Sequence, residues 1–315
     1  MWFKTLTGFR EADVADIAAQ FAVNGDHIRS LANERQMQHG TFETPTLGEL
    51  RQRCRAIARG SGGLRVREVV GDAQALHCQP ANAGACFQVA SQFNTLEMVS
   101  PSVTPEDGID RYEHDHTQGP ACAIACGAGT IYRNYLVPVD GRIGQSADRQ
   151  LNCLADLAAQ LGVDIKMRNG YALPTGGQLD TIRHRLAGVD DAARDALMAH
   201  LRIGVQSDTE VTLGGAGHTV TQAYCSALPI AYTQLPAPQW APFAQLVLDA
   251  AYEATFAAAT LNASRTGNHT VYLTRVGGGA FGNPGSWITD AIERALRVFA
   301  DADLDVAVVS YGAHR

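Results

Sequence analysis

The chain has 315 residues, 46% hydrophobic and 18% charged, which is ordinary for a water-soluble globular protein with one large domain or two smaller ones. Its formal net charge of −7 argues against a nucleic acid as the main partner, although loops of an acidic protein can still hold a nucleotide. No run approaches the roughly 18 apolar residues that span a membrane, and the N-terminus lacks a basic-then-apolar signal pattern. We therefore expect no membrane association.

The seven cysteines indicate reduced thiols. Their number is odd, their spacing is scattered and most stand in apolar surroundings, so we expect buried thiols and folding in the cytoplasm. Cys122 and Cys126 are four residues apart, but no second pair gives zinc spacing, and the histidines form no HExxH motif. The sequence therefore predicts no bound metal and no cofactor.

The first 60 residues are expected to be mainly helical. Ala12 to Ala22 is rich in alanine and amphipathic, and Thr46 with Glu49 has the spacing of a capping box ahead of a basic helix that ends at Gly60. A short break, Ser61-Gly62-Gly63, follows. We therefore expect an N-terminal helical extension over residues 1–63 and a main domain over residues 64–315.

The main domain is predicted to alternate strands with helices. One apolar strand precedes Asp72, a second runs from Phe87 to Asn94, and a third breaks at Pro229. Short helices are expected between residues 148 and 201, and a long amphipathic helix is expected to start near Pro242. This alternation predicts an α/β fold, in which a mixed sheet is covered by helices on both faces.

The last part of the chain is predicted as strand, glycine loop, helix and strand. The apolar run Val271–Val276 is followed by three consecutive glycines, by Gly282 and by a turn, and Ser286 has the position of an N-cap. A second buried strand follows over Leu304–Val309. Glycines between a strand and a helix let backbone N–H groups approach an anion, so a phosphate site is one interpretation and a tight connection is the other. The loop is neither a Walker motif nor a dinucleotide-binding GxGxxG motif.

An acidic loop follows the strand that is expected to reach Asn94. Thr117 to Pro120 ends this loop and leads into a small-residue helix, whose first turn is a second candidate phosphate site. Ligands of α/β sheets bind beyond the C-terminal strand ends, so the acidic loop and the glycine loop form one crevice if their strands are neighbours. A solvated surface loop is the alternative. The loop has few cations, and its carboxylates are Glu97, Glu106, Asp107, Asp110, Glu113 and Asp115.

The motif GGGAFGNP, with its following helix and strand, resembles the second ligand loop of macrodomains, which closes over the diphosphate and distal ribose of ADP-ribose. Residues 87–136 resemble the core of a macrodomain-like family that includes bacterial effector enzymes removing ADP-ribose from arginine. The resemblance runs from Val66 to Gly312 and implies a macrodomain-like mixed sheet between helices. The first loop departs from the common pattern, since it lacks a glycine run. The Gln-Glu-Glu signature of poly-ADP-ribose glycohydrolases is also missing.

The resemblance implies a hydrolase that removes ADP-ribose from modified protein side chains, above all from arginine. Carboxylates stabilise an oxocarbenium-like state at the anomeric carbon and pair with a guanidinium group, so Glu106, Asp107 and Asp115 are the expected catalytic residues. The residues expected to bind ADP-ribose are Asp72, Asn94, Thr117, Gln118, Gly119, Gly277, Gly278, Gly279, Ala280, Phe281 and Gly282.

The expected partners are ADP-ribose and an ADP-ribosylated protein, with the chain acting as a monomer. Asp110 and Glu113 are expected to face solvent. A non-catalytic ADP-ribose reader and a hydrolase of small ADP-ribose derivatives or of polymer stay open as alternatives. Four residues are weaker candidates for the pocket, because strand packing accounts for them equally well: Asp208, Glu210, Gln222 and Tyr224.

Overall fold

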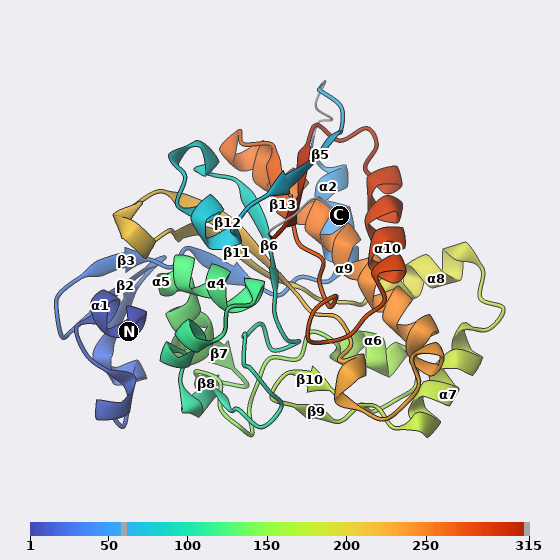
Figure 1. The fold of residues 1–315 in the computed structure, drawn as a ribbon, viewed down its shortest axis with the longest axis horizontal. Helices are drawn as coiled ribbons and strands as arrows, with labels where there is room; N and C mark the ends of the chain where they lie inside the picture. The colour runs from blue at the N-terminus through green and yellow to red at the C-terminus, as the bar shows by residue number, and fades with distance from the viewer. Residues whose placement is uncertain (58–61, 312–315) are drawn as a thin grey trace.

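The computed structural model describes residues 1–57 and 62–311, and its centre is a seven-stranded mixed sheet (Figure 1). In spatial order the strands are β4 (Thr41–Glu43), β11 (Gly204–Glu210), β12 (Thr219–Cys225), β6 (Cys86–Ala90), β13 (Thr270–Leu273), β14 (Asp305–Ser310) and β5 (Arg65–Val70). The five strands from β12 to β5 are parallel neighbours, and β11 and β4 extend one edge through antiparallel pairings.

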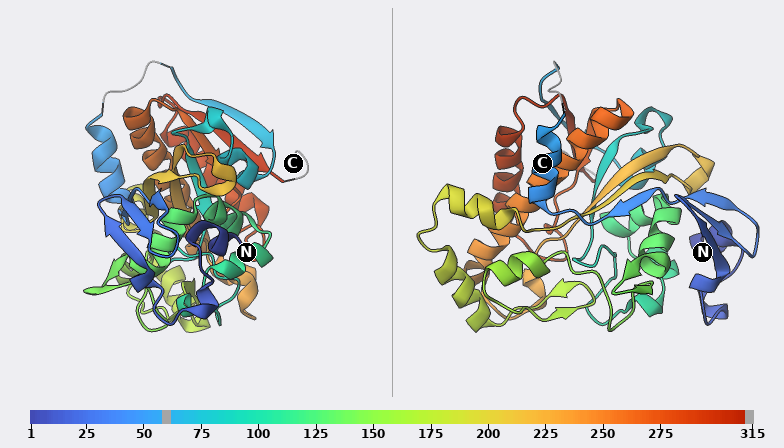
Figure 2. Two further views of the ribbon diagram at one scale, coloured as in Figure 1. Left: turned by 90° about the vertical axis from the view of Figure 1, so that its left-hand side faces the viewer. Right: turned by 180° about the vertical axis from the view of Figure 1, so that it is seen from behind.

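Helices cover both faces of the sheet, which confirms the predicted fold class (Figure 2). One face carries α9 (Ala237–Thr266), with α2 (Leu47–Arg55), α7 (Gly176–Leu186), α8 (Asp191–Met198) and α10 (Gly285–Val298) packed around it. The other face carries α3 (Ala73–His77), α4 (Gln118–Ala125) and α5 (Gly127–Ile131).

The long helix α9 is buried on nearly all sides, so its predicted amphipathic character is wrong. It begins at Ala237, earlier than predicted, and Pro242 lies in its second turn. Every position from Phe256 to Ala259 is buried. The reason is its position, because the sheet lies on one side of α9 and other helices lie on the rest.

The predicted helix from Ala12 to Ala22 is also wrong. After α1 (Trp2–Thr7), this stretch forms two 3₁₀ turns and then enters a three-stranded antiparallel sheet. Phe21, Ile28 and Met37 of this sheet pack with Phe3 in a second hydrophobic cluster that also includes residues of the acidic loop, and this burial outweighs the helix preference of alanine. The turns are η1 (Glu11–Asp13) and η2 (Ala18–Gln20), and the strands are β1 (Phe21–Asn24), β2 (His27–Ser30) and β3 (Gln36–Gln38).

The starts of α2 and α10 were both predicted from capping residues. The capping box of α2 is confirmed, because the Glu49 N–H donates to Thr46 Oγ1 (3.1 Å) and the Thr46 N–H donates to Glu49 Oε2 (2.7 Å). The N-cap predicted at Ser286 is wrong, since the extended backbone of Pro284 takes that position. The predicted helix end at Gly60, the break starting at Ser61 and the end of the resemblance at Gly312 lie outside the described residues.

Short elements complete the described chain. They are α6 (Ala155–Gln160), the hairpins β7 (Pro138–Val139)–β8 (Arg142–Ile143) and β9 (Met167–Arg168)–β10 (Tyr171–Ala172), the 3₁₀ turns η3 (Pro80–Asn82), η4 (Pro105–Asp107), η5 (Asp110–His114), η7 (Leu213–Gly215) and η8 (Ile230–Tyr232), and the π-helical turn η6 (Tyr132–Leu136). The seven cysteines are unpaired, and five of them are buried. Among the described helices, none is long and apolar enough to cross a membrane.

Candidate functional site

Two clefts open at the C-terminal ends of the parallel strands. The glycine-loop cleft, about 250 Å³ in volume, lies between the start of α4 and the loop that follows β13. The α3 cleft, about 630 Å³, lies beside α3, α4 and the end of β14. Asp115, Thr117, Gln118 and Thr274 line both, so the two clefts form one crevice. Because β6 and β13 are parallel neighbours, the expected adjacency of the acidic loop and the glycine loop is confirmed.

The three consecutive glycines after β13 differ in what an added Cβ atom would contact. Gly277 has a φ of +80°, and a Cβ there would lie 2.4 Å from the Cβ of Ala227, so the fold itself requires glycine. A Cβ on Gly278 would lie 3.0 Å from Cδ1 of Ile288 in α10. Gly279 lines the cleft, and a Cβ there would meet no atom within 4 Å. Gly279 therefore offers bare backbone to a ligand without any packing reason to be glycine.

Hydrogen bonds hold the glycine loop against η8. The Ala231 N–H donates to the carbonyl oxygen of Phe281 (3.0 Å), and Asn283 Nδ2 donates to the carbonyl oxygen of Leu228 (2.9 Å). A Cβ on Gly282 would lie 2.9 Å from the Cβ of Ala231, so this contact too depends on a glycine. Ala280 and Phe281 line the cleft next to Gly279.

The start of α4 forms the opposite side of the glycine-loop cleft. The Thr117 side chain caps no backbone N–H of the helix. Gln118 closes the end of β6, because its amide accepts the Ala90 N–H (2.8 Å) and donates to the carbonyl oxygen of Gln88 (2.8 Å). A Cβ on Gly119 would lie 2.0 Å from the carbonyl oxygen of Ala90, so glycine lets α4 approach the strand. The positive end of the α4 dipole thus lies at the crevice.

Asp115 stands at the junction of the two clefts. Its Oδ1 accepts the N–H of Thr117 (2.9 Å), which fixes the carboxylate at the entrance to α4. Its side chain is half-buried and lines both clefts. Of the three carboxylates expected to be catalytic, Asp115 is the one that the structure places in the crevice.

Glu106 and Asp107 lie away from this crevice, in a groove beside the N-terminal segment. Asp107 is the third residue of η4, and its Oδ2 accepts both the N–H (2.8 Å) and the hydroxyl (3.1 Å) of Thr104. Those two bonds hold the pKa of Asp107 below its usual range. Glu106 Oε1 accepts the N–H of Ala147 (2.9 Å). The structure therefore does not bring these two carboxylates together with Asp115.

Asp110 and Glu113, which were expected to face solvent, are partly buried in the same part of the loop. Burial raises the pKa of Asp110. Glu113 pairs with the α-amino group of Met1 at 2.6 Å, which lowers the pKa of the Glu113 carboxyl. Glu113 thus helps to attach the acidic loop to the N-terminal segment.

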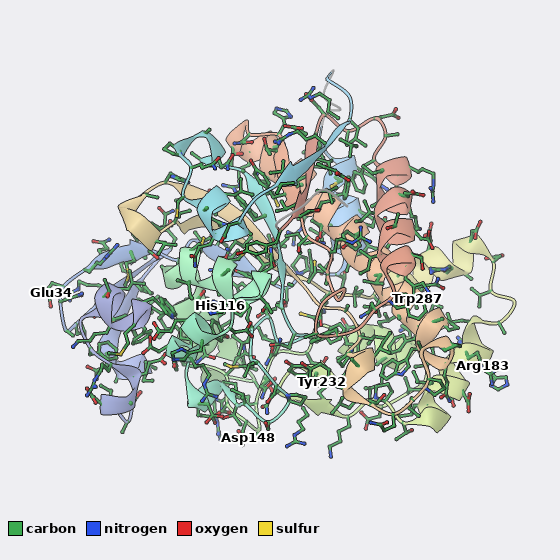
Figure 3. The ribbon with its side chains drawn as sticks, in the orientation of Figure 1. Glu34, His116, Asp148, Arg183, Tyr232 and Trp287 are labelled. Atoms are coloured by element: carbon green, nitrogen blue, oxygen red, sulfur yellow. The ribbon has the colours of Figure 1, made fainter. Side chains whose placement is uncertain are left out.

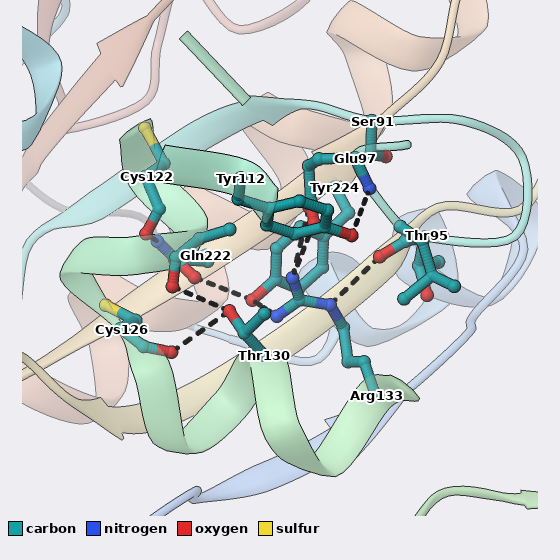
Figure 4. A network of polar contacts seen from close by, with 12 residues as sticks. Ser91, Thr95, Glu97, Tyr112, Cys122, Cys126, Thr130, Arg133, Gln222 and Tyr224 are labelled. Atoms are coloured by element: carbon teal, nitrogen blue, oxygen red, sulfur yellow. Dashed lines mark hydrogen bonds and ion pairs between the residues drawn. The ribbon is translucent and has the colours of Figure 1, made fainter. Parts of the chain in front are cut away.

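A buried ion pair lies below the glycine-loop cleft (Figure 4). Arg133 Nη2 donates to both carboxylate oxygens of Glu97 (3.0 and 3.2 Å), and both side chains are fully buried. Burial raises the pKa of Glu97 to about 7, against the opposing effect of Arg133. Burial also opposes the charge of Arg133, but Tyr224 and Glu97 keep the pKa of its guanidinium raised. Arg133 Nε donates to the carbonyl oxygen of Thr95 (2.9 Å), which fixes the start of the acidic loop.

Polar contacts continue from Arg133 through the sheet to α3. Arg133 donates to the Tyr224 hydroxyl, which donates to Oε1 of Gln222 (2.6 Å). Gln222 Nε2 donates to His77 Nε2 (3.0 Å), since His77 Nδ1 donates to the carbonyl oxygen of Ala73 (2.7 Å). Burial lowers the pKa of His77 to about 4, which favours this neutral ring. Gln222 and Tyr224 are therefore buried network residues and do not line either cleft.

The remaining predicted residues divide between the crevice and the interior. Asp72 lines the α3 cleft and caps α3, with Oδ1 accepting the N–H of Gln74 (2.7 Å). Asn94 is buried and donates to Gln150 Oε1 (2.8 Å), away from both clefts, because β6 ends at Ala90 and not at Asn94.

Asp208 and Glu210 belong to β11, the strand next to the β4 edge of the sheet. Asp208 pairs with Arg265, and Glu210 accepts the N–H of Gln38 (3.0 Å). Neither lines the crevice.

Sequence reasoning missed three side chains of the crevice. Tyr311 follows β14 directly, is 83% exposed and lines the α3 cleft. Because ligands of α/β sheets bind beyond the C-terminal ends of the strands, its position after the last strand was the signal that could have identified it. Arg275 precedes the glycine loop and lines the glycine-loop cleft, with Nη2 donating to the carbonyl oxygen of Gly285 (2.9 Å). Tyr232 had no sequence signal, because only the folded chain brings η8 beside the glycine loop.

No protein-family model and no curated protein sequence matches the chain. Solved structures do resemble it. Poly(ADP-ribose) glycohydrolase from Deinococcus radiodurans in complex with ADP-ribose has 13% identity and a TM-score of 0.44, over 87% of this chain and 88% of that one. The glycohydrolase from Thermomonospora curvata bound to the inhibitor ADP-HPD has 12% identity and a TM-score of 0.46, over 98% and 92% of the two chains.

Proposed function

We propose that the chain is a hydrolase that removes ADP-ribose from modified protein side chains, with arginine as the favoured linkage. The observation that carries this proposal is the position of Asp115. Its carboxylate stands where the two clefts meet, beside the N-terminus of α4 and across from the glycine loop. A single ligand that occupies both clefts passes this carboxylate.

The chemistry of the crevice suits the parts of ADP-ribose in order. In the α3 cleft, the Tyr311 ring can stack on adenine. The Asp72 carboxylate of the same cleft can accept a hydrogen bond from the adenine amino group. The bare backbone at Gly279 and the positive end of the α4 dipole suit the diphosphate. The distal ribose then lies in the glycine-loop cleft, with its anomeric carbon near Asp115.

In the proposed reaction, the bond between the anomeric carbon and the guanidine nitrogen breaks through an oxocarbenium-like state. The negative charge of Asp115 stabilises the positive charge that develops on the sugar and orients a water molecule toward it. The water oxygen bonds to the anomeric carbon. The bonding electron pair leaves with the guanidine nitrogen, which takes up a proton from the water. Glu97, fixed by Arg133, supports the floor of the cleft and does not react.

Arginine is the favoured linkage because of charge. Among the described residues that line the glycine-loop cleft, Glu97 is paired with the buried Arg133, and Arg275 is hydrogen-bonded to Gly285 and Thr289 of α10, so Asp115 is the charged group left to face the leaving group. A cationic leaving group is held by Asp115, whereas a carboxylate leaving group is repelled.

A non-catalytic ADP-ribose reader is the second candidate. One observation favours it, because both cleft carboxylates already have partners: Asp115 accepts the Thr117 N–H, and Glu97 is paired with Arg133. A carboxylate held in this way recognises a ligand as readily as it assists a reaction.

The deciding experiment incubates the chain with one protein ADP-ribosylated separately on arginine, on glutamate and on serine, and measures released ADP-ribose. We expect the fastest release from arginine. Binding of ADP-ribose without release from any linkage would favour the reader.

A parallel reaction with a chelator should run at the same rate, because among the described residues no group of three or more His, Cys, Asp or Glu side chains is placed to hold a metal ion. Loss of activity that magnesium restores would contradict this.

A further inference from the structure

Three aromatic rings from separate parts of the chain form one wall of the glycine-loop cleft. They are Tyr171 of β10, Tyr232 of η8 and Phe281 of the glycine loop. The ring centroids of Tyr171 and Tyr232 are 5.2 Å apart, those of Tyr171 and Phe281 5.3 Å, and those of Tyr232 and Phe281 5.7 Å. These separations are typical of aromatic groups that pack on one another.

The wall has a fixed interior and an open end. The Tyr171 hydroxyl donates to the carbonyl oxygen of Met98 (2.7 Å), and its ring is buried. Phe281 is half-buried and held through its carbonyl oxygen by the N–H of Ala231. Tyr232, labelled in Figure 3, is 36% exposed. It is therefore the ring of this wall that an incoming side chain can cover.

The polar groups around that ring leave room for a cation on it. Among the described residues that line the cleft, no lysine and no histidine is present, and Arg275 is held against α10, because its Nη2 donates to the carbonyl oxygen of Gly285 and the hydroxyl of Thr289. Met98 and Val99 add apolar surface to the same cleft. An aromatic face, an apolar surface and the carboxylate of Asp115 together suit a planar guanidinium on a methylene stem.

We infer that Tyr232 is a specificity residue, which selects an arginine acceptor by stacking on its guanidinium while Asp115 pairs with the same group. This inference rests on the proposed function and adds the part of the site that holds the modified side chain rather than ADP-ribose. An exposed cation–π contact is modest in energy. It therefore changes the choice between acceptors more than the affinity for free ADP-ribose.

The test uses two peptides of one sequence, carrying ADP-ribose on arginine in the first and on serine in the second. Tyr232→Leu removes the ring, Tyr232→Phe keeps it, and Tyr232→Lys places a cation there. We expect Tyr232→Leu to lower the arginine-to-serine ratio of kcat/KM by about two- to fivefold. Tyr232→Lys should lower it further, and Tyr232→Phe should retain it. The Kd for free ADP-ribose should stay within about twofold in all three.

Two results overturn the inference. One is an unchanged ratio in folded Tyr232→Leu and Tyr232→Lys. The other is a loss of free ADP-ribose affinity that matches the loss in kcat/KM, because the ring would then contact ADP-ribose itself.

Failure of the proposed hydrolase gives a different result. If the unmodified chain releases no ADP-ribose, both peptides are stable ligands, and their Kd values replace kcat/KM in the same comparison. The inference then stands if Tyr232→Leu weakens binding of the arginine peptide about two- to fivefold relative to the serine peptide, and falls if the two Kd values change equally.

Discussion

The middle and the two ends of the acidic loop have the same kinds of side chain but different surroundings. In the middle, Asp107 caps a 3₁₀ turn and Glu113 pairs with the N-terminus. At the ends, Glu97 is sealed below the glycine-loop cleft by Arg133, and Asp115 stands in the crevice. The difference teaches that a carboxylate's role depends on which donors the fold places beside it. The density of acids along the chain does not decide it.

The largest effect is expected where the ion pair below the cleft is broken. Arg133→Met leaves the Glu97 carboxylate buried without its partner, which should lower the free energy of unfolding by about 3–5 kcal/mol in urea denaturation. The double variant Glu97→Leu with Arg133→Met removes both charges and should regain most of this loss. A single variant as stable as the unmodified chain would show that Glu97 is not held as described.

Next in size is the loss of charge at the crevice end of the loop. Asp115→Asn should slow release of ADP-ribose from modified arginine about a hundred- to a thousandfold, because it deletes an electrostatic group aimed at the transition state. Binding of free ADP-ribose, measured by calorimetry, should stay within about tenfold.

The matched variants in the middle of the loop are Asp107→Asn and Glu106→Gln. Asp107→Asn keeps a side-chain oxygen that can accept the Thr104 N–H, so it should lower the unfolding free energy by less than about 0.5 kcal/mol, with little change in rate. Equal rate losses in Asp107→Asn and Asp115→Asn would erase the distinction between the two regions.

A smaller effect is expected on the opposite side of the crevice. Gly279→Val should weaken ADP-ribose binding by at least about tenfold with little change in stability, because Gly279 lines the cleft and a Cβ there would meet no protein atom within 4 Å. Gly277→Ala is the contrasting variant and should mainly destabilise the fold, since its φ of +80° and the contact with Ala227 both disfavour a Cβ. Unchanged affinity in folded Gly279→Val would remove this loop from the site.

A further expected effect is a pH dependence of stability from Glu97. Burial raises its pKa from 4.5 to about 7, so the folded chain binds this proton more tightly than the unfolded chain. Its contribution to stability is thus fully present below about pH 4.5 and is lost as the pH rises to about 7. Glu97→Gln should remove that part of the decline in urea unfolding curves. An identical pH profile in the variant would show that Arg133 keeps Glu97 ionised throughout.

Local patterns made part of the fold predictable. The stretch from β13 to β14 followed from an apolar run, a glycine loop and a helical repeat, all of which act between near neighbours in the chain. The N-terminal strands did not, because each has three or four residues and is stabilised by contacts of Phe21, Ile28 and Met37 with distant parts of the chain. A pattern of two or three alternating residues is too short to distinguish a strand from a loop.

The candidate site was predictable to the same extent. The two loops and Asp115 could be predicted, because strand ends and glycines mark ligand loops in α/β sheets. Tyr232 and the Glu97–Arg133 pair could not, since they meet only when η6 and η8 pack beside the strand ends. Glu106 and Asp107 were expected in the site from carboxylate chemistry and from the resemblance, neither of which shows that their oxygens accept hydrogen bonds from Ala147 and Thr104.

The most direct test of the central claim is a crystal structure of the chain in complex with ADP-ribose. We predict adenine beside Asp72 and Tyr311, the diphosphate between the Gly279 backbone and the first turn of α4, and the anomeric carbon of the distal ribose next to the Asp115 carboxylate. ADP-ribose bound in the groove lined by Glu106 and Asp107, or with its distal ribose turned away from Asp115, would contradict it.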